Sequence, residues 1–301
     1  QIHVYVDRFN FTLATHPRLP LVTSRVNPLQ QKMSLKPDCH SDFDPWVYIQ
    51  EYYGSLTSWH RSPLKHLHEF FTSHFKERAD LKFLNFGSGP VVAFEASVVP
   101  YAQQIVLAEY TENNRAVAKL WLDQANNGPD FTALYKYVVQ ELEGKGPEEV
   151  DKRQEAVRHL ATLCRCDIFQ DTPIEKGYEG PYDVIYTAST LEMACANTEE
   201  YGTAVSKLSA MLKPGGWLLM NVSMGEAGTV NVCHVGRTRF VELNISVDEM
   251  YAILQRRCGF ERESINIIPQ AADKVDAIPM LLEEHIDEMM FVIAQRKQST
   301  A

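Results

Sequence analysis

Two glycines and a glutamate occupy positions where a sheet could bind a small ligand. Gly87 and Gly89 directly follow a short apolar run at residues 81–86, and the next apolar run ends in Glu109, 20 residues after Gly89. A loop without Cβ atoms can turn sharply and bring its backbone N–H groups against a ligand. An acidic residue at the end of the next strand can bind both hydroxyls of a ribose. These residues predict a nucleoside-cofactor site, and the alternative is a simple turn followed by a surface glutamate.

The same loop does not suit a dinucleotide. A dinucleotide fold prefers a third glycine three residues after the second, so that helix and strand can pack closely. Val92 occupies that position here, and Phe94 and Glu95 follow it. The pyrophosphate of NAD would therefore be poorly accommodated.

A second acidic residue follows a third short strand. Asp167 comes directly after residues 164–166 and before Ile168. A carboxylate at the carboxyl end of a strand can accept the adenine amino protons, and the backbone N–H of Ile168 can bind the ring. The alternative for Asp167 is a helix or turn cap.

These side chains need an open α/β sheet to bring them together. Strands are predicted at residues 81–86, 105–108, 164–166, 182–187, 217–222, 264–268 and 289–294. Helices are predicted from Ser62, with Pro63 as first residue, and at residues 91–99, 131–142 and 147–163, and after Thr111, Thr198 and Ser246. Alternation of this kind is typical of a doubly wound sheet with helices on both faces.

An aromatic helix is predicted before the first strand. Tyr48, Tyr52 and Tyr53 lie at i, i+4 and i+5 after Asp44 and so fall on one side of that helix. Core packing alone could explain this spacing. Aromatic rings with a polar tip could equally exclude water from a site and hydrogen-bond to a ligand.

Several of these segments together resemble one family, the small-molecule amine methyltransferases that act on nicotinamide, phenylethanolamine and indolethylamine (thioether) acceptors. The resemblance runs from about Phe43 to Lys297. It is carried by Phe43-Asp44-Pro45-Trp46-Val47-Tyr48, Glu51-Tyr52-Tyr53, Gly87-Ser88-Gly89-Pro90, Glu109-Tyr110-Thr111-Glu112-Asn113-Asn114, Cys166-Asp167-Ile168 and the turn Lys213-Pro214-Gly215-Gly216.

The resemblance implies a class I S-adenosylmethionine-dependent methyltransferase of Rossmann-like fold. Its α/β sheet would have seven strands, mostly parallel, with an antiparallel C-terminal hairpin. The implied cofactor contacts are Tyr48, Tyr53, Gly87, Ser88, Gly89, Glu109, Tyr110, Thr111, Asn114, Asp167, Ile168 and Ala188. The implied substrate contacts are Tyr48, Ser189, Glu192, Asn221, Glu242 and Glu284, with Glu192 and Tyr48 as catalytic candidates.

The resemblance implies the identity of the methyl acceptor less directly. Glu192 matches the acidic residue of amine-using members, so it is the expected proton acceptor, although it could merely begin a helix. Asn221 replaces an acid of the nicotinamide enzyme, which favours an arylalkylamine over nicotinamide. Residues 223–240 exceed the family pattern by about five residues and leave acceptor identity open. A sulfur, selenium or oxygen acceptor, or a silent S-adenosylmethionine-binding protein, are the alternatives.

Composition excludes several other classes. The formal net charge of the 301 residues is −10, without a basic cluster, so a nucleic-acid substrate is not expected. No apolar run approaches the roughly 18 residues of a membrane span, and no signal peptide is recognisable. The six cysteines show no zinc spacing, and the predicted chemistry needs no metal. We expect a monomeric, cytoplasmic enzyme.

The domain organisation is predicted to be simple. Residues 1–40 carry four prolines and no periodicity and are interpreted as a flexible extension, with Met33 as a possible start of a shorter product. Residues 41–297 form the methyltransferase domain, and residues 298–301 form a tail.

Overall fold

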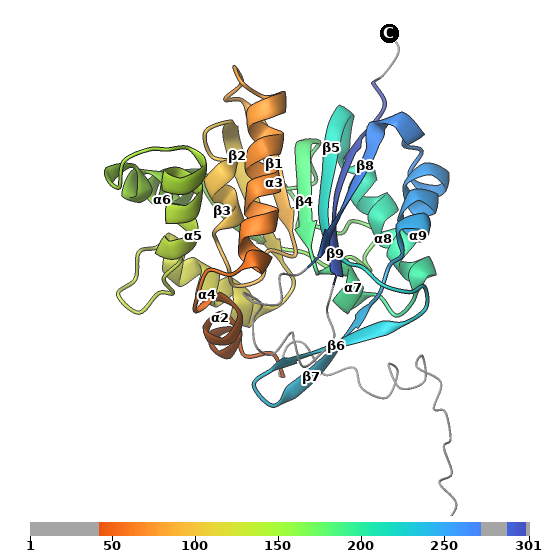
Figure 1. Ribbon diagram of the computed structural model, residues 1–301, viewed down its shortest axis with the longest axis horizontal. Helices are drawn as coiled ribbons and strands as arrows, with labels where there is room; N and C mark the ends of the chain where they lie inside the picture. Colours follow the sequence, from red (N-terminus) through yellow and green to blue (C-terminus); the bar gives the residue numbers. More distant parts are fainter. Residues whose placement is uncertain (1–41, 272–287, 299–301) are drawn as a thin grey trace, which may run out of the picture.

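The computed structural model describes residues 42–271 and 288–298. A seven-stranded sheet forms its centre, in the order β3-β2-β1-β4-β5-β9-β8 (Figure 1). The strands are β1 (Leu81–Phe86), β2 (Ala102–Glu109), β3 (Ala161–Arg165), β4 (Tyr182–Ala188), β5 (Leu212–Ser223), β8 (Ile265–Ala271) and β9 (Glu288–Gln295). The first five are parallel, and β9 is antiparallel to both β5 and β8. The predicted fold class is confirmed.

Helices cover both faces of the sheet (Figure 1). The α-helices are α2 (Pro45–Tyr53), α3 (Ser58–His74), α4 (Glu112–Leu122), α5 (Thr132–Lys136), α6 (Glu148–Leu160), α7 (Leu191–Ala194), α8 (Thr198–Ala210) and α9 (Val247–Ala252). Two π-helical turns, η2 (Tyr137–Leu142) and η3 (Ile253–Arg257), continue α5 and α9, and short 3₁₀ helices lie at η1 (Phe94–Ser97) and η4 (Arg262–Ser264).

Strand alternation divides the core into two layers. Phe83 of β1 packs with the apolar residues of α3, α5 and α6, whereas Leu84 and Phe86 pack with those of α8 and α9. Successive side chains of a strand point to opposite faces, so a strand buried on both sides reads as a continuous apolar run. This explains why β1 could be recognised from the sequence.

Two predicted helix boundaries are wrong. Helix α3 begins at Ser58, four residues before the Ser62-Pro63 start, because the Thr57 N–H donates to Nδ1 of His60 at 3.1 Å and caps an earlier turn. Pro63 therefore lies inside the helix, where it is buried. The expected helix end at Leu163 belongs instead to β3.

The helix predicted over residues 91–99 is reduced to the single 3₁₀ turn η1. All nine of these residues are buried, and four of them are valine. A segment without a polar face, rich in β-branched residues, has little preference for a regular surface helix.

An unpredicted β-hairpin covers the carboxyl end of the sheet. Strands β6 (Val230–Val235) and β7 (Thr238–Leu243) pair antiparallel and form a separate two-stranded sheet. They occupy the long segment after β5, and Figure 1 shows them beside α2 and α7. The extra residues thus form part of the structure that covers the carboxyl end of the sheet.

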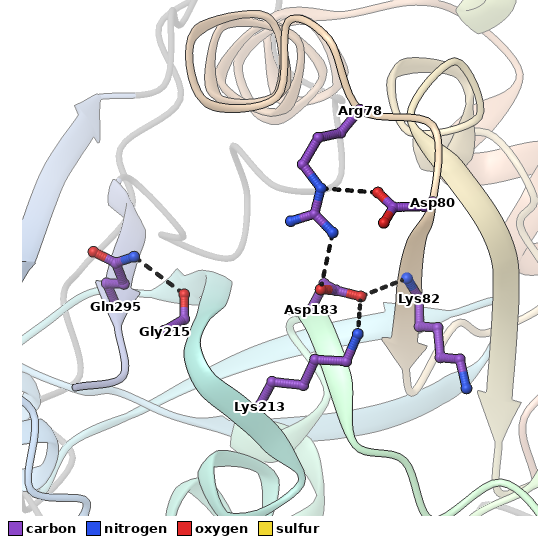
Figure 2. Close-up of polar contacts among 7 residues, drawn as sticks. All are labelled: Arg78, Asp80, Lys82, Asp183, Lys213, Gly215 and Gln295. Carbon is purple, nitrogen blue, oxygen red and sulfur yellow. Dashed lines mark hydrogen bonds and ion pairs between the residues drawn. The ribbon is translucent and has the colours of Figure 1, made fainter. Parts of the chain in front are cut away.

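A polar cluster joins the opposite, amino edge of the sheet (Figure 2). Asp183, at the start of β4, accepts hydrogen bonds from the Lys82 N–H at 2.8 Å and from Lys213 Nζ at 2.7 Å. Arg78 lies 3.6 Å from its other oxygen and also pairs with Asp80. Asp183 therefore ties together the starts of β1, β4 and β5.

Some predictions concern residues outside the described ranges. These are the extension at residues 1–40, the start at Met33 and the substrate residue Glu284. Among the described residues, no helix has both the length and the apolar character needed to cross a membrane.

Candidate active site

A cavity of about 610 Å³ lies at the carboxyl edge of the sheet, beneath α2 and the hairpin. Its walls include nearly all of the predicted site residues: Tyr48, Tyr53, Gly87, Ser88, Gly89, Glu109, Tyr110, Thr111, Asn114, Asp167, Ile168, Ala188, Ser189, Asn221 and Glu242. Its size is ordinary for a small-ligand pocket. Glu192 is absent from the lining within the described part of the chain.

The glycine loop is shaped by its two positive φ angles. Gly87 has φ 72° and Gly89 has φ 62°, a region that side chains with a Cβ rarely adopt. A Cβ on Gly87 would also lie 2.1 Å from the Thr190 side chain. The Gly87 and Ser88 N–H groups both donate to the Ala108 carbonyl, at 2.7 and 3.1 Å, which fixes the loop against the end of β2.

Glu109 is held rigidly at the end of β2. One oxygen, Oε1, accepts from the Thr111 N–H and Oγ1 and from Asn114 Nδ2, at 2.8 to 3.1 Å. The other, Oε2, accepts from the Gly89 N–H at 3.0 Å. A carboxylate oxygen has two acceptor sites, so Oε2 retains capacity for a ribose hydroxyl.

An unsatisfied atom beside Glu109 points to the same ligand. Oδ1 of Asn114 is buried, and no partner for it exists in the described ranges. Native proteins rarely leave such atoms without a partner, which a bound ligand can supply. The residues of this part of the cavity therefore fit the nucleoside of S-adenosylmethionine.

Asp167 caps a turn and also lines the cavity. Its carboxylate accepts from the Phe169 N–H and from Gln170 Nε2, each at 3.1 Å, so it stabilises its own turn. It also lines the cavity together with Ile168. Phe169, which the sequence analysis missed, lines the same region and is 54% exposed, so its ring can cover an adenine.

The tyrosine helix α2 closes the cavity. Asp44 caps it by accepting from the N–H groups of residues 46 and 47, and Pro45 is at its first position. The Tyr48 ring centroid lies 5.0 Å from that of Tyr52 and 5.6 Å from that of Tyr53. The predicted clustering of the three rings is confirmed.

Burial and the neighbouring Tyr53 raise the pKa of Tyr48 well above its ordinary value. Tyr48 is therefore a neutral phenol at physiological pH. In this state it can donate or accept a hydrogen bond and position a ligand, but it cannot supply negative charge.

Two contacts attach α2 to the hairpin. The Tyr52 hydroxyl donates to the His234 carbonyl at 2.7 Å, and Glu51 Oε2 accepts from the Gly236 N–H at 2.9 Å. A small apolar cluster of Cys233, Val235, Phe240 and Met289 lies beneath, with Phe43 and Trp59 packed against it. These apolar and aromatic residues form one lobe of the cavity, which could not be recognised from the sequence.

Glu192 is buried behind the wall, at 2% exposure, in the short helix α7. Its carboxyl group has a long contact with the Tyr201 hydroxyl, 3.5 Å, and a hydrogen bond from the backbone of Ser223. Burial, with a smaller contribution from Glu242, raises its pKa to about 8. The structure therefore places this predicted catalytic residue near the cavity but not on its surface.

Glu242 is the carboxylate on the cavity wall. It is 6% exposed, on β7, and accepts from Ser223 Oγ at 2.7 Å. Ser223 thus contacts both glutamates, because its hydroxyl bonds Glu242 and its backbone bonds Glu192. Glu192 was the expected proton acceptor and Glu242 only a substrate contact, yet the hairpin places Glu242 on the cavity wall and Glu192 lies behind it.

Comparisons with known proteins agree with this architecture. The chain is 28% identical to human nicotinamide N-methyltransferase (Homo sapiens), over 77% of this chain and 87% of that protein. It is 26% identical to indolethylamine N-methyltransferase of Oryctolagus cuniculus, over 62% and 69%. It is 23% identical to phenylethanolamine N-methyltransferase of Sus scrofa, over 86% and 90%.

Among solved structures, the DhpI–SAH complex shares the fold, with a TM-score of 0.50 at 10% identity, over 92% of this chain and 100% of that one. The model of the NNMT/PNMT/TEMT family matches residues 31–297. The chain therefore belongs to the NNMT/PNMT/TEMT family and is an S-adenosylmethionine-dependent methyltransferase.

Proposed function

We propose that the protein methylates the nitrogen of a small amine, preferentially an arylalkylamine. The observation that carries this proposal is the carboxylate of Glu242 on the wall of an otherwise aromatic and apolar lobe. An arylalkylamine matches that lobe, since its ring can pack against Trp59 and Phe240 while its ammonium group meets the carboxylate.

S-adenosylmethionine, when bound, supplies a methyl group already activated by a positively charged sulfur. The protein contributes position and the exclusion of water. Glu109 and the glycine loop would hold the nucleoside, and α2 with the hairpin would close over both ligands. These roles follow from the contacts that fix each residue in place.

The two glutamates would bind the protonated amine and accept its proton. An alkylamine resembles a lysine side chain, with an ordinary pKa near ~10, and must lose a proton before its nitrogen can attack a methyl group. We assign the ammonium contact to Glu242 and the accepting carboxylate to Glu192, which lies behind the cavity wall and would receive the proton through water, with Ser223 contacting both glutamates. The raised pKa of Glu192, about 8, suits a base working near neutral pH.

Nicotinamide is the second candidate, favoured by a different atom. Oδ1 of Asn221 is buried beside the cavity and has no partner in the described ranges, and it could accept from a carboxamide. The pyridine nitrogen of nicotinamide carries no proton at neutral pH. The two glutamates would then have no proton to accept, which is why the amine is preferred.

The test is methyl transfer from a labelled donor to four acceptors: an indolethylamine, a phenylethanolamine, nicotinamide and a small thiol. We expect an arylalkylamine to give the highest kcat/KM, and Glu242→Gln to raise its KM. A preference for nicotinamide or the thiol would overturn the proposal. Cofactor binding without turnover of any acceptor would favour the silent alternative.

We also propose that the enzyme acts as a cytoplasmic monomer. A single chain supplies every wall of the described cavity, and the described cysteines, Cys164, Cys166, Cys195, Cys233 and Cys258, are free thiols. Light scattering at micromolar concentration should give a mass near 34.3 kDa, and a dimer mass would contradict the monomer. Cell fractionation tests the compartment.

A further inference from the structure

A further buried carboxylate lies in the 3₁₀ turn that follows the glycine loop in the chain, and it has no role in the mechanism above. Glu95, in η1, is fully buried, with 0% exposure. Asn85 Nδ2 donates to its Oε1 at 2.7 Å. Its Oε2 is also buried, and no partner for it exists in the described ranges. Such burial is costly for a carboxylate unless positive charge or further donors compensate it.

The groups packed around Glu95 do not provide that charge. Tyr53, Tyr135 and Tyr186 interact with it from α2, α5 and β4, and burial raises the pKa of each phenol, so all three are neutral. The hydroxyls of Tyr135 and Tyr186 likewise have no partner in the described ranges. His60, on α3, lies one layer further out, with its ring centroid 4.8 Å from that of Tyr53, and burial lowers its pKa to about 4, so it is neutral too.

The nearest guanidinium on α6 is already engaged. Arg153 donates to the Ala96 carbonyl at 2.5 Å, next to Glu95 in the chain. Its two terminal nitrogens also bind both oxygens of Glu143, at 2.8 and 2.7 Å. Arg153 is thus engaged by Glu143, which also binds Lys145 Nζ at 2.8 Å. Within the described residues, the Glu95 carboxylate is compensated by the Asn85 amide and by the backbone of Ala93 and Glu95, and by no cation.

Asn85 connects Glu95 to the cavity. Asn85 lies on β1 just before the glycine loop and lines the cavity with Tyr53, Phe94 and Tyr186. Because its Nδ2 donates to Glu95, its Oδ1 is the end of the amide left to accept from a ligand. The nucleoside is assigned to Glu109 and the acceptor to Glu242, so this part of the cavity is left for the amino-acid end of the cofactor.

We propose that Glu95 is a positioning residue for the α-ammonium group of S-adenosylmethionine, acting through Asn85. Its negative charge polarises the Asn85 amide and directs Oδ1 toward the ammonium group. This proposal rests on the cofactor and not on the identity of the acceptor, so it can fail while amine methylation stands, and the reverse.

The titration of Glu95 gives the proposal a measurable signature. Burial raises its pKa to about 7. A bound ammonium group favours the ionised carboxylate, so ligand binding below pH 7 should release a proton from Glu95. Above about pH 8 the carboxylate is already ionised, and no proton should be released.

The experiment compares two ligands by calorimetry. S-adenosylhomocysteine carries the ammonium group, whereas adenosine lacks the whole amino-acid end. Glu95→Gln keeps the shape of the side chain and should weaken the binding of S-adenosylhomocysteine by roughly ten-fold, while the affinity for adenosine stays unchanged. Glu109→Ala is the matched control, because it should weaken the binding of both ligands.

Two further measurements separate positioning from a merely structural role. At pH 6.5, in two buffers of different ionisation enthalpy, the wild type should release protons on binding S-adenosylhomocysteine and Glu95→Gln should not. Adding Asn85→Asp to Glu95→Gln places a carboxylate directly on the cavity and should restore affinity. Equal weakening of both ligands, an absence of proton release in the wild type, or no rescue would overturn the proposal.

Discussion

Strand β4 has a buried carboxylate near each of its ends, and the two differ in their surroundings. Asp183, at the amino end, is 8% exposed and has Lys213, Arg78 and a backbone N–H around it (Figure 2). Glu192, beyond the carboxyl end, is 2% exposed and has a phenol at 3.5 Å and backbone donors.

We infer that this difference separates carboxylates that serve the fold from carboxylates that serve a ligand. A buried charge that serves the fold comes with cations and donors that compensate its lost hydration. Glu95 and Glu192 lack a cation among the described contacts, and both lie near the cavity. A ligand that carries positive charge would complete their environment, which is what an ammonium substrate and a sulfonium cofactor offer.

The largest expected effect is on turnover. Glu192→Gln should lower kcat/KM for the amine by on the order of 10²–10⁴, because the amide cannot accept the proton. Cofactor affinity should change little. In the wild type, kcat should rise as the pH approaches about 8 and Glu192 ionises. Equal amine rates in the two proteins would remove Glu192 from the mechanism.

The next effect is on cofactor binding at the same edge of the sheet. Glu109→Ala removes charge-assisted hydrogen bonds worth roughly 1.5–3 kcal/mol each, so the Kd for S-adenosylmethionine should rise ten-fold or more. Calorimetry measures it. Glu112→Ala, an exposed neighbour, is the control and should bind normally. Unchanged binding by Glu109→Ala would reject the ribose assignment.

At the amino edge of the sheet, replacing the buried carboxylate should lower stability and leave cofactor binding unchanged. Asp183→Asn should lower the free energy of unfolding by about 1–3 kcal/mol, because Lys213 and Arg78 lose their shared partner. Cofactor affinity should stay as in the wild type. Urea unfolding provides the measurement, and the exposed Asp80→Asn should be nearly silent. A binding defect in Asp183→Asn without lost stability would break the distinction between the two edges.

The smallest expected effect is the pH dependence of stability without ligands. The raised pKa values, about 7 for Glu95 and about 8 for Glu192, mean that the folded state binds more protons than the unfolded state above pH 4.5. Their stabilising contribution is full below that pH and is lost as the pH rises through 7 to 8. The urea midpoint should fall between pH 6 and 9.

Two variants test whether the pH dependence of stability comes from the glutamates at the carboxyl edge of the sheet. Glu192→Gln should flatten the decline of the urea midpoint, whereas Asp183→Asn should retain it. A wild-type midpoint that does not fall between pH 6 and 9 would show that neither glutamate is protonated in the folded protein.

The sequence by itself determined the sheet and most of the residues that line the cavity at its carboxyl edge. Continuous apolar runs marked the parallel strands, and Gly87, Gly89, Glu109 and Asp167 all line one cavity as predicted. These signals are local, because parallel strands end at a common edge and the residue after a strand is carried there by the strand itself.

Local signals failed where two of them competed. The Ser62-Pro63 pair resembles a helix start, yet Thr57 and His60 cap an earlier turn and the buried Pro63 is tolerated inside α3. The apolar segment after the glycine loop resembles a helix but forms only η1. Tertiary burial decided both cases, since it outweighs the modest propensities of single residues.

Only the tertiary structure decided which acidic side chains reach the ligand. Whether Glu242 faces the cavity depends on the register of β6 with β7, and a shift by one residue would turn it outward. Met193 and Ala194 of α7 line the cavity, whereas Glu192 of the same short helix faces Tyr201. Glu95 gains its position from Asn85, ten residues earlier. Such side-chain directions arise from contacts between different elements of the fold, and residue types alone do not contain them.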